Sequence, residues 1–196
     1  MKKYLIILST ILMSFTVIND APIDRIGVPG PLIFNSKDFN FSWSDKPNET
    51  YYIQEYFPKK QSAENYKEML TIHLFVTDLT LNDAVDQKIE ELNIRKQTDI
   101  TCNYKANYSP DKKEIIVDFV LSDMKNNIIN TAEFNIYRYK QIDLDNNKKG
   151  ILIFAYTKRN DKNSVDYFFN NLGDIRKKSL KTMISIEMPK VKILEN

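Results

Sequence analysis

The side chains best suited to covalent chemistry are the only histidine of the chain, His73, and its only cysteine, Cys102. An imidazole beside a thiol can remove the thiol proton and create a thiolate nucleophile, which serves hydrolases and transferases. The stretch Asp99-Ile100-Thr101-Cys102-Asn103-Tyr104 alternates like a β-strand, whereas nucleophiles more often occupy a turn or a helix start. We therefore expect Cys102 to be a buried core residue, and His73 to be a partly exposed or hydrogen-bonded strand residue.

Metal and phosphate sites have little support in the sequence. A single histidine excludes a His-His-carboxylate site and disfavours zinc. Asp143, Asp145 and Asn147 alternate in a polar loop and could offer oxygens to Ca²⁺, but Lys148 and Phe154 stand where a calcium loop needs Gly and Glu. The four glycines of the chain do not form a phosphate-binding loop. We expect no metal and no cofactor.

Basic and aromatic residues mix in Tyr137-Arg138-Tyr139-Lys140, as they do in platforms that bind single-stranded nucleic acid. In a strand, the two tyrosines share one face and Arg138 points the other way. The chain has 28 Lys and Arg against 26 Asp and Glu, so it has no wide basic surface. We expect an outer strand with tyrosines at its rim and no nucleic-acid partner. Glu90 and Glu91 are adjacent carboxylates elsewhere in the chain. We expect them on an exposed helix face, not as an acid–base pair.

The start of the chain has the layout of a secretory signal peptide. Lys2 and Lys3 precede the segment 4–18, which contains only apolar, Ser and Thr residues. This run is shorter than the roughly 20 residues that cross a bilayer as a helix. We predict a signal peptide over 1–20, a Pro- and Gly-rich linker over 21–31, and a single domain over 32–196. The mature protein is expected to be periplasmic or secreted and to have no stable membrane span.

Alternation of apolar and polar residues in the first half of the chain predicts strands at 39–43, 51–57 and 69–77. The first two form a hairpin around a turn at 44–48. Ser62 can cap a short helix over 63–69. Thr80 and Asp83 have the spacing of a capping box, which predicts a helix that continues to about residue 92.

The second half of the chain predicts an antiparallel meander of four strands at 100–108, 115–121, 128–139 and 151–157. The strand 115–121 is apolar on both sides except at Asp118, so we place it centrally and expect a helix to cover it.

A long last helix is predicted from Ser164, its N-cap, with a closing strand at 183–188. Its buried stripe comprises Val165, Phe168, Phe169, Leu172 and Ile175. Gly173 lies inside it, and several cations follow in its last turn. The predicted fold class is α+β: an antiparallel meander packed against two main helices.

The segment from Tyr56 to Thr71 (YFPKKQSAENYKEMLT) resembles a phrase found in small uncharacterised exported bacterial proteins. In that phrase a strand ends at a proline, and a polar turn leads to a short helix that bears an aromatic residue, here Tyr66. The order of helix, meander, long C-terminal helix and final strand also resembles the PsbP-like α/β/α sandwich. This resemblance implies binding or scaffolding and supplies no catalytic residues.

These observations favour an exported, non-enzymatic binding or accessory protein of the cell envelope or extracellular space. The alternative is a hydrolase or transferase whose polar residues converge only in the folded chain. A third reading is a carrier of a small apolar ligand, which would need an enclosed aromatic cavity. The expected partner is therefore an unidentified protein or a small apolar ligand.

Overall fold

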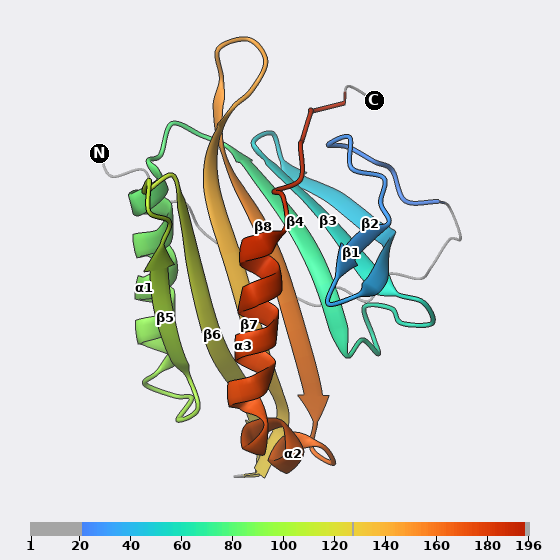
Figure 1. Ribbon diagram of the computed structural model, residues 1–196, viewed down its shortest axis with the longest axis vertical. Coiled ribbons are helices and arrows are strands. Elements are labelled where there is room, and N and C mark those ends of the chain that lie inside the picture. The colour runs from blue at the N-terminus through green and yellow to red at the C-terminus, as the bar shows by residue number, and fades with distance from the viewer. Residues whose placement is uncertain (1–20, 127, 195–196) are drawn as a thin grey trace.

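The computed structural model describes residues 21–126 and 128–194, which form one antiparallel sheet and helices on both of its faces. The strands are β1 (Leu32–Phe34), β2 (Lys37–Asn48), β3 (Tyr51–Pro58), β4 (Glu68–Val76), β5 (Asn103–Tyr108), β6 (Glu114–Lys125), β7 (Ile128–Asp143) and β8 (Lys149–Asp161). The helices are α1 (Leu81–Arg95), α2 (Val165–Asn170) and α3 (Leu172–Ser185). The predicted α+β class with an antiparallel sheet is confirmed (Figure 1).

The eight strands lie in the order β1-β2-β3-β4-β8-β7-β6-β5. The predicted meander is present because β5, β6, β7 and β8 are neighbours in sequence order. The first four strands form a second meander, and β4 joins the two by pairing with β8 from Glu68↔Lys158 to Val76↔Gly150. Strands from the two halves of the chain therefore meet in the middle of the sheet.

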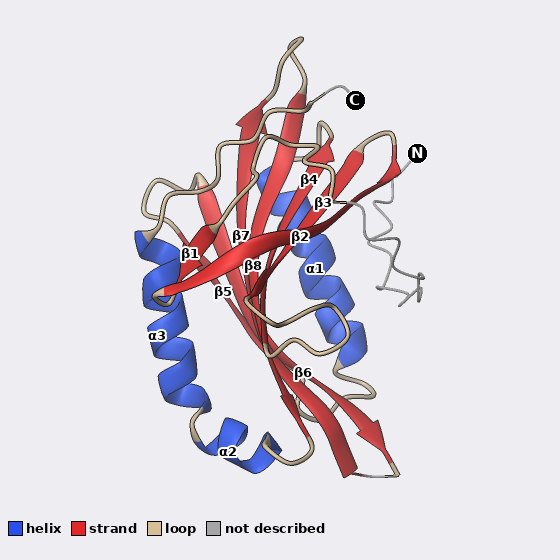
Figure 2. Cartoon of the chain, turned by 90° about the vertical axis from the view of Figure 1, so that its right-hand side faces the viewer, coloured by secondary structure: helices blue, strands red, loops and turns tan. Residues whose placement is uncertain are grey.

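Each face of the sheet has its own hydrophobic core. Helix α1 covers one face, where Val85 and Leu92 pack with residues of β6 such as Val117. Helices α2 and α3 cover the opposite face, where Phe168 and Met183 join a larger core. Figure 2 shows α1 and α3 on opposite sides of the sheet. We expected two main helices, and the described residues form three because the last helix is divided.

The packed part of the chain begins before the predicted domain start at residue 32. Ile26 is fully buried and Val28 nearly so, both within the predicted linker 21–31. The carboxylate of Asp24 accepts hydrogen bonds from the backbone N–H groups of both residues. The Val28 carbonyl in turn accepts from the Tyr56 hydroxyl at 2.6 Å. The Pro- and Gly-rich segment 21–31 is therefore packed against the domain and is not a linker. The predicted signal peptide, 1–20, lies outside the described residues.

The predicted first hairpin forms, but its boundaries differ. Strand β2 runs through the predicted turn 44–48, and the chain reverses at Glu49 and Thr50 instead. A register shift follows Phe41, which lets Trp43 become 43% exposed while Phe39 stays buried. The aromatic side chains of this strand are therefore fully buried only at the Phe39 end.

The predicted short helix over 63–69 is wrong. Residues 62–65 make a single turn, closed by a bond from the Asn65 N–H to the Ser62 carbonyl. The side-chain oxygen of Gln61 then accepts the N–H groups of Lys67 and Glu68, and β4 begins there. A side chain that satisfies these backbone donors removes the need for helical bonds. Tyr66 packs against Phe57 from this turn, with ring centroids 5.6 Å apart.

The predicted long last helix is broken at Asn171 into α2 and α3. Ser164 does not cap it through its side chain, because its hydroxyl bonds back to Asp161. Gly173 is exposed near the start of α3, and a Cβ there would contact nothing within 4 Å, so it does not serve close packing. The predicted strand 183–188 is also wrong, since α3 continues to Ser185.

Arg138 of β7 holds the end of α3. Its guanidinium donates to the carbonyls of Met183 and Ile186 at 2.6 and 2.8 Å, and it pairs with Glu114 at 2.5 Å. A cation that donates to the free carbonyls of a helix end replaces their missing intrahelical donors. The cations from Arg176 to Lys181, which we expected in the last turn, lie earlier because α3 is longer than predicted.

Strands β6 and β7 differ in position from the prediction. Strand β6 is covered on both faces as expected, but it is second from the edge and not central. Strand β7 lies inside the sheet, so Tyr139 is fully buried and Tyr137 half-buried, and the predicted tyrosine rim is wrong. Strand β5 begins only at Asn103, because Ile100 lies in a turn and is 89% exposed.

The two ends of the described chain are joined to each other and to the sheet. The N–H groups of Lys192 and Leu194 donate to the carbonyls of Ile26 and Arg25. Asn35, in the β1–β2 turn, exchanges side-chain hydrogen bonds with Ser179 and Thr182 of α3. The first strands and the last helix therefore stabilise each other directly.

Candidate ligand-binding pocket

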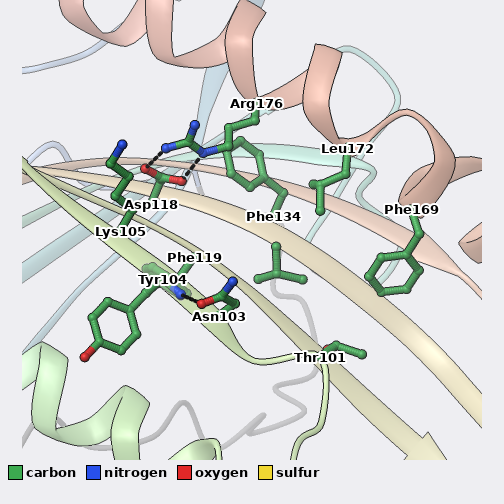
Figure 3. Close-up of a pocket in the computed structure, with 11 residues that line it drawn as sticks. Thr101, Asn103, Tyr104, Lys105, Asp118, Phe119, Phe134, Phe169, Leu172 and Arg176 are labelled. Carbon is green, nitrogen blue, oxygen red and sulfur yellow. Dashed lines mark hydrogen bonds and ion pairs between the residues drawn. The ribbon is translucent and has the colours of Figure 1, made fainter.

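A half-open cavity of about 560 Å³ lies between strands β5–β6 and helices α2–α3 (Figure 3). Its apolar wall is formed by Val120, Phe134, Phe169 and Leu172. Strand pairing places Val120 directly beside Phe134 of β7. The break between α2 and α3 places Phe169 and Leu172 on either side of the bend, so two short helices supply the roof.

Charged side chains gather at the other end of the pocket. Arg176 of α3 donates from Nε and Nη2 to the two carboxylate oxygens of Asp118, at 2.6 and 2.9 Å. Asn107 adds a weaker bond of 3.4 Å. Lys105 is the direct strand partner of Asp118. The Asp118 carboxylate also raises the pKa of the Arg176 guanidinium, mainly through this hydrogen bond. Both carboxylate oxygens of Asp118 are thus occupied by the Arg176 guanidinium.

The structure keeps His73 and Cys102 apart. His73 lies in β4, and Cys102 directly precedes β5. Four strand steps separate β4 from β5 in the sheet, which is about 19 Å at ~4.8 Å per step. An imidazole and a thiol at that separation cannot exchange a proton directly.

His73 is half-buried in a row of aromatic rings. Its Nδ1 atom shares a hydrogen bond of 2.8 Å with the Tyr51 hydroxyl, and Tyr137 lies 6.0 Å away between centroids. Burial lowers the pKa of His73 to about 3, with a smaller contribution from the charge of Lys88. The imidazole is therefore neutral at neutral pH and serves as a hydrogen-bonded strand residue.

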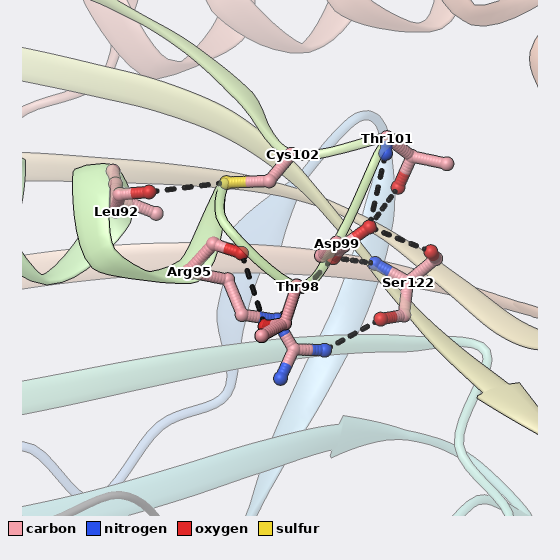
Figure 4. Close-up of polar contacts among 7 residues, drawn as sticks. All are labelled: Leu92, Arg95, Thr98, Asp99, Thr101, Cys102 and Ser122. Carbon is pink, nitrogen blue, oxygen red and sulfur yellow. Dashed lines mark hydrogen bonds and ion pairs between the residues drawn. The ribbon is translucent and has the colours of Figure 1, made fainter.

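Cys102 belongs to the core beneath α1 (Figure 4). It is 5% exposed, and its Sγ atom contacts the Leu92 carbonyl at 3.5 Å. Burial raises the pKa of the thiol, and Asp99 adds to this effect. A neutral thiol is a poor nucleophile because the thiolate is the reactive form.

We predict that Cys102 reacts slowly with thiol reagents while the protein is folded and rapidly once denaturant is added. Cys102→Ala should cost about 1 kcal/mol of unfolding free energy, through packing alone. Labelling kinetics with and without denaturant provide the measurement. Rapid stoichiometric labelling of the folded protein would contradict a buried structural role.

A polar cluster that the sequence did not reveal surrounds the buried carboxylate of Asp99 (Figure 4). It accepts from the N–H and the hydroxyl of Ser122 at 2.7 and 2.8 Å, and from the same two groups of Thr101 at 3.0 and 2.8 Å. Burial alone would raise the pKa of Asp99, but these hydrogen bonds hold it below its usual value. Arg95 joins the cluster, so it ties the end of α1 to β6. The spacing of Asp99 and Thr101 is typical of an Asp side chain that bonds to the backbone two residues on, and this was the one signal of the cluster in the sequence.

Glu55 of β3 is a second group that sequence reasoning missed. It lies opposite Thr71 of β4, on the face that carries His73. Burial raises the pKa of Glu55 to about 7, and the charge of Arg159 only partly opposes this. Alternation in β3 could have placed Glu55 on this face, but nothing in the sequence indicated its burial.

Glu55 is expected to make stability depend on pH. Its pKa is higher in the folded than in the unfolded chain, so its contribution is fully present below pH ~4.5 and is lost as the pH rises through about 7. Glu55→Gln should therefore gain about 3 kcal/mol over the parent between pH 4 and pH 8. Urea unfolding at both pH values measures this, with the exposed Glu90→Gln as control. Equal pH profiles for parent and Glu55→Gln would contradict the assignment.

The remaining candidates do not form a site in the described residues. Asp143, Asp145 and Asn147 are exposed around the β7–β8 loop. Glu90 is exposed on α1, and Glu91 pairs with Lys88 at 2.9 Å. Within 21–126 and 128–194, no three His, Cys, Asp or Glu side chains gather as metal ligands. In the same part of the chain, no helix combines the length and apolarity needed to cross a membrane.

Comparison with known proteins identifies a family for this chain but no individual relative. No curated protein and no solved structure matches it. One family model matches residues 26–188. The match begins at the buried Ile26 and ends at the buried Met188, so it includes the whole sheet, all three helices and the pocket. The chain therefore belongs to this family, which is uncharacterised.

Proposed function

We propose that this protein is an exported, non-enzymatic binding protein that holds a ligand with an apolar body in the pocket between β5–β6 and α2–α3. The observation that carries the proposal is the pocket itself. Its volume of about 560 Å³ falls within the roughly 300–1,000 Å³ of small-molecule sites. Phe169 and Leu172 lie at one end, which suits an apolar group (Figure 3).

The placement of the reactive side chains supports binding over catalysis. His73 is neutral and bonded to Tyr51, and Cys102 is buried in a separate core. Asp118, the carboxylate at the pocket, is occupied by Arg176. The signal-peptide layout of the first residues supports export, and helices on both faces of an antiparallel sheet support a PsbP-like sandwich as part of the same proposal.

The pocket can be tested by filling it. Leu172→Trp should lower the affinity for the neutral fluorescent probe N-phenyl-1-naphthylamine by about tenfold or more, because the larger ring occupies the ligand space. Ile184→Trp is the matched control, since Ile184 is on the same helix and 64% exposed. Thermal melting verifies that both variants fold. Equal affinity of Leu172→Trp and parent would show that the probe binds elsewhere.

Export is tested separately. N-terminal sequencing of the native protein should find a mature start between residues 15 and 22, in a fraction outside the cytoplasm. An intact Met1 in the soluble cytoplasmic fraction would contradict export and would leave the pocket experiment unaffected.

A further inference from the structure

We infer that the pocket selects amphipathic molecules that carry a single anionic group next to the apolar body. This inference rests on the proposed function, because it names the ligand class of the same pocket. Figure 3 shows Lys105, Asp118 and Arg176 together at one end, while Leu172 and Phe169 lie at the other. A ligand that fills the pocket would thus present one end to charged groups and the other to hydrocarbon.

The charged end is cationic overall. Two cations, Lys105 and Arg176, face one carboxylate, that of Asp118. Arg176 uses Nε and Nη2 for this carboxylate. Among residues 21–126 and 128–194, neither Nη1 of Arg176 nor the ammonium of Lys105 is paired with a carboxylate. Both groups can donate to an oxyanion without breaking the existing ion pair.

The surroundings strengthen the preference for an anion. Val120 and Phe134 also line the pocket, and the Arg176 side chain is 36% exposed, so its guanidinium is accessible to a head group. Asn103 contributes an amide whose oxygen already accepts the Tyr104 N–H at 3.0 Å, which leaves its NH₂ group as a donor toward the pocket. A cationic head group would be repelled by Lys105 and Arg176, and Asp118, the carboxylate among the described lining residues, is already paired with Arg176.

The experiment compares ligands that share one chain and differ in charge. Decanoate should bind about tenfold more tightly than decanol in isothermal titration, since one charge-assisted hydrogen bond is worth roughly that factor, and decylamine should bind more weakly than both. The preference should shrink as salt is added. Carboxylates and phosphate monoesters both present anionic oxygens that accept hydrogen bonds from Lys and Arg. Comparing decyl phosphate with decanoate tells which head group is favoured.

Variants separate recognition from structure. Lys105→Gln should lower the ratio of decanoate to decanol affinity to near one, whereas the exposed Lys178→Gln on α3 should leave this ratio as in the parent. Asp118→Asn should increase the preference for decanoate, because it removes the competing anion and releases Arg176. A purely structural ion pair would leave the ratio of affinities unaltered in Asp118→Asn, and melting curves verify the fold of each variant.

The outcomes distinguish the two proposals. If decanol does not bind the parent protein, the proposed function fails. If decanol binds but decanoate binds no more tightly, or decylamine binds best, the pocket stands and the inference of an anionic ligand is overturned.

Discussion

Phe168→Ala is expected to lower the free energy of unfolding by about 3–5 kcal/mol, the usual loss for a fully buried phenylalanine. Phe168 has no exposed surface and packs edge-on against Phe169, with centroids 5.1 Å apart. Helix α2 is six residues long and lacks a side-chain cap, so it depends on tertiary packing for its stability. Urea unfolding followed by circular dichroism measures the loss.

The adjacent Tyr167→Ala is the control, because Tyr167 lies on the same helix but is 69% exposed. Its effect should stay within about 0.5 kcal/mol. A change below about 1 kcal/mol in Phe168→Ala would show that this face of α2 is not part of the core.

Arg138→Met is expected to cost about 3 kcal/mol, because charge-assisted hydrogen bonds to a helix end and a shielded carboxylate are lost together. The side chains of Arg138 and Glu114 are only 11% and 18% exposed, so water cannot replace the lost partner easily. The carbonyls of Met183 and Ile186 would also lose their donor. Amide hydrogen exchange should therefore become faster in the last turn of α3, and the free energy of unfolding of the whole protein should fall.

Lys140→Met provides the comparison for this effect. Lys140 lies on the same strand and pairs with the same Glu114 at 3.0 Å, but its side chain is 39% exposed and such pairs contribute at most about 1 kcal/mol. Equal losses in the two variants would mean that the helix-end carbonyls contribute nothing to the role of Arg138.

Local patterns predicted the parts of the fold that depend on neighbours in sequence. The meander followed from alternation between short polar connections, and Thr80 with Asp83 makes the capping box that starts α1. The errors lie where distant groups decide the structure. Gln61 ends the expected helix by bonding to Lys67, and Arg138 holds α3 beyond the point where a strand was expected. Side-chain contacts of this kind leave no periodic signal.

The pocket was beyond prediction for a related reason. Asp118 stood out in the sequence as a charge in an apolar strand, yet its partner Arg176 was expected to serve the helix dipole. The two meet only because the last helix breaks at Asn171 and α3 crosses the same face of the sheet. Phe169 and Leu172 were predicted as core residues, and they also line the cavity that this break creates.

The link between the β1–β2 turn and α3 has a consequence for the order of folding. Asn35 donates a hydrogen bond to Ser179 and accepts one from Thr182, and these bonds close loops of 144 and 147 residues. Closing such long loops has a large entropic cost that must be met before their contacts form. The meander of β5 to β8 closes only short hairpins, so it can form first and offer β8 as a template for β4. We expect the first strands and α3 to dock last and together, and folding to be slow for a chain of this size, because pairing between distant segments slows folding.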